Sequence, residues 1–190
     1  LDGPVKSENT TFLLSARRTY IDLVSSPLIS LGSSGNLNAG YYFYDINGKI
    51  NHKISDSDRV FFSTYLGNDV GYSAITNEQG SSTDRIDVTE SNGLRWGNIT
   101  SVLRWNHVFS PKVFSNLSLT YNRYKIDIVS ELSVKETANE GELLEESSSK
   151  YFSNIRDYTI KYDIDYSPSP WHEIKTGVNA IWHRFNPGVL

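Results

Sequence analysis

The sequence contains no cysteine, which excludes disulfides, thiolate metal sites and cysteine nucleophiles. No apolar run reaches the roughly 18 residues that a transmembrane helix needs. Charged residues make up only 21% and the net charge is −4. These values exclude the high charge of a disordered chain and the basic surplus of a nucleic-acid-binding domain. No signal peptide stands at Leu1, and we expect the chain to be a piece of a larger protein.

What the sequence has instead is a series of long stretches in which apolar and polar residues alternate, as in β-strands. Short turns rich in Ser, Asp, Asn and Pro, at 6–9, 55–58, 110–112 and 167–170, separate them. Long polar loops are predicted at Ile21–Gly40, Gly71–Asn92 and Val129–Asn154, with a short helix near Tyr20–Ile29. The seven predicted strands are Thr10–Tyr20, Tyr41–Ile54, Arg59–Asp69, Leu94–Phe109, Val113–Ile128, Ile155–Tyr166 and Glu173–Phe185.

The two faces of these strands differ in polarity. In Ile155–Tyr166, one face carries Tyr158 and Ile160, and the other carries Asp157 and Lys161. A soluble antiparallel sheet with one wet face gives the same alternation. The strands are longer than the usual 5–6 residues, however, and a strand that crosses a bilayer needs about 9–11. Aromatic residues also gather at the strand ends, as in the two girdles of outer-membrane barrels.

This pattern predicts an all-β fold, an antiparallel up-and-down meander that forms an arc of a transmembrane β-barrel. In lipid, every backbone polar group has to be paired, so the sheet must close on itself. Single-chain bacterial barrels have an even number of strands. Because seven is odd, we expect these strands to belong to a larger barrel.

Several phrases resemble the early barrel of TonB-dependent outer-membrane receptors, particularly those of Bacteroidetes-type bacteria. The resemblance spans nearly the whole chain and implies a barrel of about 22 strands around an N-terminal plug, energised by the TonB complex. The plug and the other strands are not in the 190 residues. The phrases are Gly3-Pro4-Val5-Lys6, Thr11–Tyr20, Gly40–Asn47, Trp96-Gly97-Asn98, Leu103–Ser110, Ile155–Tyr158 and His183–Gly188.

The sequence shows no arrangement typical of catalysis, and we expect no enzyme activity, no metal and no cofactor. It has no nucleophile elbow and no glycine-rich phosphate loop. The glutamates from Glu136 to Glu146 form an acidic stretch, read as a solvated loop, with cation capture as the alternative. The four histidines are not at metal-ligand spacing and are expected to be structural; they are His52, His107, His172 and His183.

The polar phase of the strands is expected to line the lumen. Solvation of a wet interior accounts for it, and contact with the plug is the functional alternative for residues near the short turns. Those candidates are Lys49, Asn51, Lys53, Arg104, Asn106, Asp163 and Asp165.

Five of the nine arginines lie on the lipid-facing phase near the long-loop ends. A charge on that face costs about 2–4 kcal/mol at the midplane but roughly 0–1 near the interface. Since guanidinium binds phosphate in a bidentate way, we predict a ring at similar height that holds lipopolysaccharide head groups. The alternative is that the side chains snorkel to water or pair with loop carboxylates. The five are Arg18, Arg95, Arg123, Arg156 and Arg184.

The expected function is therefore active uptake of a scarce nutrient through the bacterial outer membrane. The resemblance implies an iron chelate, cobalamin, a glycan or a peptide as cargo. The expected partners are outer-membrane lipid, lipopolysaccharide and the TonB complex, with no nucleic acid. The alternatives are a passive porin-like barrel and a soluble β-rich surface adhesin.

Overall fold

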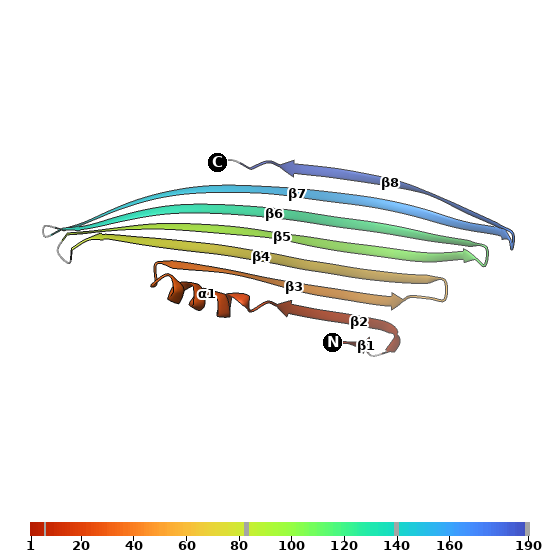
Figure 1. Ribbon diagram of the computed structural model, residues 1–190. Coiled ribbons are helices and arrows are strands. Elements are labelled where there is room, and N and C mark those ends of the chain that lie inside the picture. Colours follow the sequence, from red (N-terminus) through yellow and green to blue (C-terminus); the bar gives the residue numbers. More distant parts are fainter. Residues whose placement is uncertain (6, 82–83, 139–140, 189–190) are drawn as a thin grey trace.

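In the computed structural model, residues 1–5, 7–81, 84–138 and 141–188 are described, and they form one open antiparallel sheet with one helix (Figure 1). The order of strands in the sheet is their order in the chain. This confirms the predicted all-β meander, and an open curved sheet is the form expected of a barrel arc. The strands are β1 Asp2–Val5, β2 Ser7–Arg18, β3 Leu37–Lys53, β4 Asp58–Gly80, β5 Arg85–Ser110, β6 Val113–Ala138, β7 Gly141–Ser169 and β8 His172–Asn186.

The sheet gains one strand over the prediction, because β1 pairs with β2 through four residues. Of the predicted first turn at 6–9, residues 7–9 already belong to β2, and Lys6 is outside the described residues. The predicted short helix is confirmed as α1, Ile21–Gly32, which lies beside β3 (Figure 1). Asp22 in its first turn is favoured there by the helix dipole and accepts a hydrogen bond from Arg18 at 2.9 Å. None of the described helices is long and apolar enough to cross a membrane.

Two of the three predicted long loops are wrong. Gly71–Asn92 and Val129–Asn154 are largely strand, since β4 runs on to Gly80, β5 starts at Arg85, β6 runs to Ala138 and β7 starts at Gly141. Their apolar residues are sparse and, on β5 and β6, lie on face B rather than face A, as with Ile86, Val88, Leu132 and Val134, so the period-two signal of the turn side does not continue in phase. The backbone still pairs in register, because ladder hydrogen bonds do not depend on the polarity of the side chains.

The two ends of the sheet differ in their connections (Figure 1). At the end called here the turn end, β3–β4, β5–β6 and β7–β8 are joined by short turns, as predicted. In the first of these turns, Ser55 Oγ donates to Asp58 at 2.8 Å and Lys53 Nζ contacts Asp56 at 2.5 Å. At the opposite end, called the hairpin end, β4–β5 and β6–β7 form long extended hairpins.

The register divides the side chains between two faces of the sheet. Face A contains Ile46, Leu119 and Tyr158, and face B contains Lys49 and Asp163. No hydrophobic side chain in the described ranges is buried, so these strands have no core of their own. Large apolar side chains stand exposed on face A, among them Tyr158 at 50% and Trp182 at 75%. Exposed apolar area of this extent marks a surface that meets lipid or another protein.

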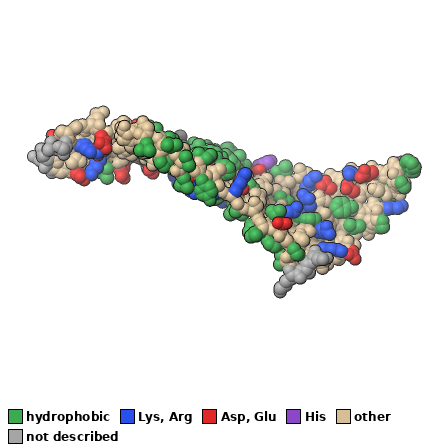
Figure 2. All heavy atoms as spheres, turned by 60° about the horizontal axis from the view of Figure 1, so that its bottom comes forward, with side chains coloured by type: hydrophobic (Ala, Val, Ile, Leu, Met, Phe, Trp, Pro, Cys, Tyr) green, Lys and Arg blue, Asp and Glu red, His purple; other side chains and the backbone are tan. Residues whose placement is uncertain are grey.

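The polarity of the two faces reverses partway along the strands. Between the turn end and Arg123, the apolar residues of β6 lie on face A; they are Leu117, Leu119 and Tyr121. Between Arg123 and the hairpin end, the apolar residues nearest to Arg123 lie on face B; they are Tyr124, Ile126 and Ile128. The same reversal occurs on β7 and on β5. Figure 2 shows hydrophobic side chains gathered over the middle of the sheet, while polar side chains dominate toward the hairpin end.

Candidate functional site

Three arginines lie side by side on face A where the polarity reverses. Arg123 on β6 pairs with Arg156 on β7, which pairs with Arg184 on β8. We call these three the arginine row. On β3, β4 and β5 the same register line is occupied by Ile46, Leu66 and Ile99. The row therefore borders the apolar part of face A on its hairpin side, along β6, β7 and β8.

The arginine row has no counter-charge within the part of the chain that the structure describes. None of its members makes an ion pair, and Arg156 Nε is buried without a hydrogen-bond partner. Arg156 and Arg123 are half-buried, and Arg184 is exposed. Like charges directly opposite each other on neighbouring strands repel. The row is thus a concentrated positive charge on the border of an apolar surface.

An apolar groove lies directly on the turn side of the arginine row. Its volume is about 950 Å³. The next register line on face A is aromatic, with Tyr121, Tyr158 and Trp182, and the rings of Tyr121 and Tyr158 are 5.3 Å apart. The line after that is aliphatic. The face A side chains of the groove are Ser101, Leu103, Leu119, Tyr121, Tyr158, Ile160, Ala180 and Trp182.

A second hollow of about 270 Å³, called here the cationic hollow, lies on the hairpin side of Arg123 and has Tyr44, Leu66 and Ile99 as its apolar side chains. Arg95, Arg123 and Lys125 line it together with Asp127, whose carboxylate contacts Lys125 Nζ at 2.5 Å. Gly97 lies at the centre of its lining, opposite Asn68 and Lys125 in register. Three cations against one carboxylate leave the hollow positive.

The other two predicted rim arginines are on face A but not in the row. The register line of the arginine row passes through Ala16 on β2 and Ile99 on β5. Arg18 is two residues from this line and Arg95 is four residues from it, both toward the hairpin end. Arg18 is already partnered, by Asp22 at 2.9 Å and by the ring of Tyr42 at 4.6 Å. Arg95 stands opposite Asp127. In the register of the sheet, the five arginines are therefore a row of three with two outliers.

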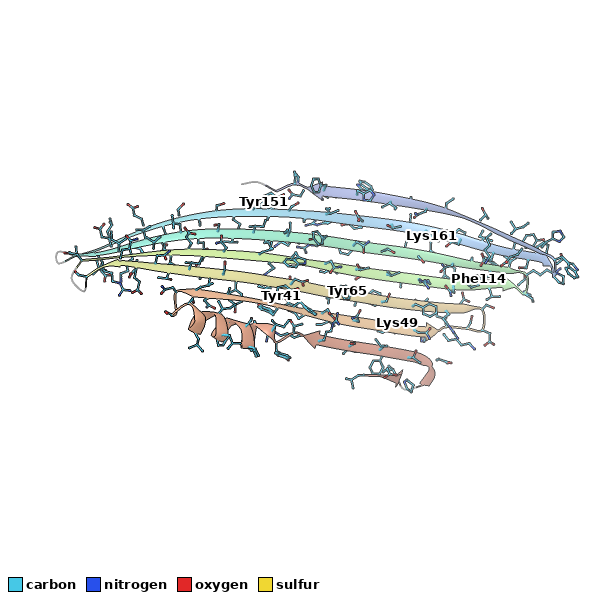
Figure 3. All side chains as sticks on the ribbon, in the orientation of Figure 1. Tyr41, Lys49, Tyr65, Phe114, Tyr151 and Lys161 are labelled. Carbon is cyan, nitrogen blue, oxygen red and sulfur yellow. The ribbon has the colours of Figure 1, made fainter. Side chains whose placement is uncertain are left out.

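The predicted lumen residues gather in neighbouring register lines near the turn end of face B. Lys53, Asn106 and Asp163 share one line with Arg59 and Asn116. Asn51 and Arg104 share the next line, and Lys49 and Asp165 lie on lines to either side (Figure 3 labels Lys49). Asp163 pairs with Lys161 at 2.9 Å. The Oδ1 atoms of Asn51, Asn106 and Asn116 are buried without a partner in the described chain.

The hairpin side of face B carries an aromatic cluster that the sequence analysis did not identify. The rings of Tyr41 and Trp96 stack at 6.1 Å with an interplanar angle of 24°, and Phe43 is 6.4 Å from Tyr41. Tyr41 is on β3 and Trp96 on β5, so the rings meet across β4, where Gly71 stands opposite Tyr41 and leaves room for them. We call Tyr41, Phe43 and Trp96 the aromatic cluster. Figure 3 labels Tyr41 with Tyr65 of β4 near it.

Charged groups frame the aromatic cluster. Tyr41 donates its hydroxyl hydrogen bond to Asp69. Arg17 contacts the buried Asp45 carboxylate at 2.6 Å and lies 5.3 Å from the centre of the Phe43 ring. Flat ring faces beside carboxylates and a guanidinium bind molecules that combine apolar faces with polar edges. The reversal of phase at Tyr41 and Phe43, and at Leu94 and Trp96, is the sequence signal that indicates this cluster.

The histidines each share a hydrogen bond with one neighbouring side chain, and the acidic stretch lies on β6 and β7 rather than in the predicted loop, with its described glutamates exposed. His107 contacts Asp58 at 2.7 Å, and His183 contacts Asp157 at 2.7 Å. His52 and His172 bond to Thr10 and Ser169. In the acidic stretch, Glu142 pairs with Lys135 at 3.1 Å, and Glu140 is outside the described residues. The described ranges hold no group of three or more metal-ligating side chains.

Comparison with known proteins returns little. No family model and no curated protein matches the sequence. Among solved structures, the chain is similar to the crystal structure of a Pseudomonas aeruginosa FadL homologue, with 7% sequence identity over 97% of this chain and 68% of that one. The TM-score is 0.25, which is too low to carry an argument.

Proposed function

We propose that this chain is a segment of an outer-membrane β-barrel receptor that imports a nutrient without chemical change to it. The turn side of the sheet supports this placement, since its face A is apolar enough to meet lipid and its face B is polar enough to meet a wet lumen. The short turns then lie on the periplasmic side, and the long hairpins rise outside the membrane. The resemblance to TonB-dependent receptors supplies the energy source, the TonB complex.

The free edge of β8 supports a larger barrel. β8 pairs only with β7 among the described strands and is exposed along its whole length. A strand in lipid cannot leave its outer row of N–H and C=O groups unpaired. Further strands of the same barrel are the partners that complete it, in line with the 22 strands that the resemblance implies.

The aromatic cluster is the observation that favours a receptor over a passive porin. A diffusion pore needs a wet, weakly interacting wall, whereas a receptor has to hold scarce cargo long enough to import it. Tyr41 and Trp96 form a stacked aromatic platform on the hairpin side of face B, with Asp69 and the Arg17–Asp45 pair at its edges. Ferric chelates, cobalamin, glycans and peptides all combine apolar faces with polar edges.

The polar lines at the turn end of face B suit contact with a plug domain. Asn51, Asn106 and Asn116 each hold a buried Oδ1 atom without a partner in the described chain. An unpaired buried acceptor costs about 1–3 kcal/mol. A plug whose backbone or side-chain N–H groups reach these oxygens removes that cost, and we expect the same plug to contact Lys49, Lys53, Arg104, Asp163 and Asp165.

Uptake by cells that produce the full-length protein tests the proposal. The probes are radiolabelled ferric citrate, cyanocobalamin, a malto-oligosaccharide and an alanine peptide, each supplied with and without an intact TonB complex. We expect saturable uptake of one probe, lost without TonB and weakened by Trp96→Ala. Uptake that rises linearly with concentration and ignores TonB indicates the porin. A full-length protein that is soluble and monomeric without detergent indicates the adhesin.

A further inference from the structure

We propose that face A binds lipopolysaccharide at a defined site, with a phosphate on the arginine row and an acyl chain in the adjoining apolar groove. The proposal rests on the outer-membrane placement above, with the hairpin end directed outward. It does not depend on the cargo or on the energy source.

The order of side-chain types along face A matches the order of chemical groups in an amphiphile with an anionic head. From the hairpin end toward the turn end, successive lines of face A on β6, β7 and β8 are arginine, aromatic and aliphatic. Lines of one face are about 7 Å apart along a strand. Phosphate, the lipid interface and acyl chains follow one another in the same order in the outer leaflet, and aromatic side chains favour the interface between them.

The charge of the arginine row needs an external anion. Neighbouring strands are about 4.8 Å apart, so the three guanidinium groups span roughly 10 Å. Their mutual repulsion is not relieved by an ion pair in the described chain, and Arg156 Nε has no hydrogen-bond partner. A phosphate accepts two parallel hydrogen bonds from one guanidinium, which satisfies such groups and offsets the repulsion.

The cations of the cationic hollow indicate a large head group with more than one phosphate. It extends the positive surface from Arg123 to Lys125 and Arg95, on the side away from the acyl groove. A phospholipid has one phosphate and a small head, which the arginine row alone accommodates. The phosphorylated sugars of lipopolysaccharide reach both the row and the hollow, and this assigns the site to lipopolysaccharide.

The Ala180 position gives the groove room for a chain. Ala180 lies opposite Ile160 on the aliphatic line, and its small side chain leaves space beside Trp182 and Tyr158. A larger apolar residue at 180 fills the groove without adding a charge or a polar group to the lipid-facing surface. The acyl part of the site can therefore be tested separately from its phosphate part.

The experiment measures lipopolysaccharide bound to the full-length protein purified from outer membranes, by mass spectrometry of the released hydroxy fatty acids, and by titration with purified lipopolysaccharide. We expect the triple variant R123Q/R156Q/R184Q to bind at least about tenfold more weakly, a change of about 1.4 kcal/mol. Ala180→Phe should weaken binding by at least about threefold through the lost acyl contact. Arg59→Gln, on face B, is the matched control and should bind as the wild type does.

A second variant distinguishes loss of the binding site from misfolding of the triple Gln variant. The triple Arg→Lys variant keeps the charge but loses the bidentate geometry, and it should fall between the wild type and the Gln variant. Unchanged binding by a folded triple Gln variant overturns the proposal. So does equal competition by phosphatidylglycerol vesicles, because that outcome makes the row a general anionic-lipid contact. Cargo uptake should persist in all these variants, so loss of lipid binding and failure of the proposed transport remain distinguishable.

Discussion

The turn side and the hairpin side of this sheet have opposite polarity on the same strands. On the turn side face A is apolar and face B carries Lys49, Arg104 and Asp163. On the hairpin side face B carries the aromatic cluster, while Lys125 and Asn154 point from face A. The backbone ladder continues through the change without a register shift on β6–β7.

The difference shows that each face meets two environments along its length. On the turn side of the arginine row, face A is proposed to meet lipid and face B a wet lumen. On the hairpin side, face A is proposed to meet water, and aromatic rings pack against one another on face B. A strand that crosses such a boundary keeps its period of two but changes which phase is apolar, and the reversal marks the height of the boundary.

The largest expected effect comes from a charge placed below the boundary. Leu119→Arg puts a cation in the aliphatic line of face A and should lower the free energy of unfolding by about 2–4 kcal/mol. Val129→Arg, on the same face and strand but on the hairpin side, should cost only about 0–1 kcal/mol. Urea-induced unfolding of the full-length protein in lipid vesicles measures both values. Equal losses would contradict a lipid boundary at the arginine row.

A middle-sized effect is expected from the aromatic cluster. Trp96→Ala removes the stack with Tyr41, which is worth about 0.5–1.5 kcal/mol beyond the buried area. Amide hydrogen exchange should accelerate on the hairpin side of β3, β4 and β5 and stay unchanged near the turn end. Leu94→Ala, on the same strand and face, removes a side chain that has no ring to stack on Tyr41; it is the control and should accelerate exchange less. Uniform acceleration along the strands would show that the two sides unfold as one unit.

The smallest expected effect is at the turn end. The hydrogen bond from Lys53, followed by its charge, lowers the pKa of the exposed Asp56 carboxyl below its ordinary value of 3.8. Because the pKa in the folded state is the lower one, the stabilisation is present above the ordinary value and is lost as the pH falls through the folded one. Lys53→Gln should raise the pKa of Asp56 toward 3.8, as measured by carboxyl-carbon NMR titration. An unchanged pKa would show that the contact does not persist in solution.

Sequence reasoning found the turn sides of the strands, where face A is densely apolar and face B is polar. It located β8 within a residue at each end, at His172 and Asn186 against a prediction of Glu173–Phe185. It missed the far halves of β4 to β7, because Gly71–Asn92 and Val129–Asn154 have few apolar residues, and on β5 and β6 these lie on the opposite phase from the turn side. These segments form strands because each hairpin arm pairs with its neighbour, and such pairing cannot be seen in one segment alone.

The same division holds for the candidate sites. Alternation placed Arg123, Arg156 and Arg184 on one face from sequence alone, because side-chain direction follows from position along a strand. Whether they lie next to one another depends on the register between strands, which cannot be read from one strand alone. The paired sheet aligns these three in one row and leaves Arg18 and Arg95 outside it. Likewise, Tyr41 and Trp96 are distant in the chain, and the ladder of β3, β4 and β5 brings their rings together. The sequence by itself determined the strand type and the facing of each side chain; the tertiary structure decided which side chains are neighbours, since neighbours across a sheet are chosen by inter-strand register.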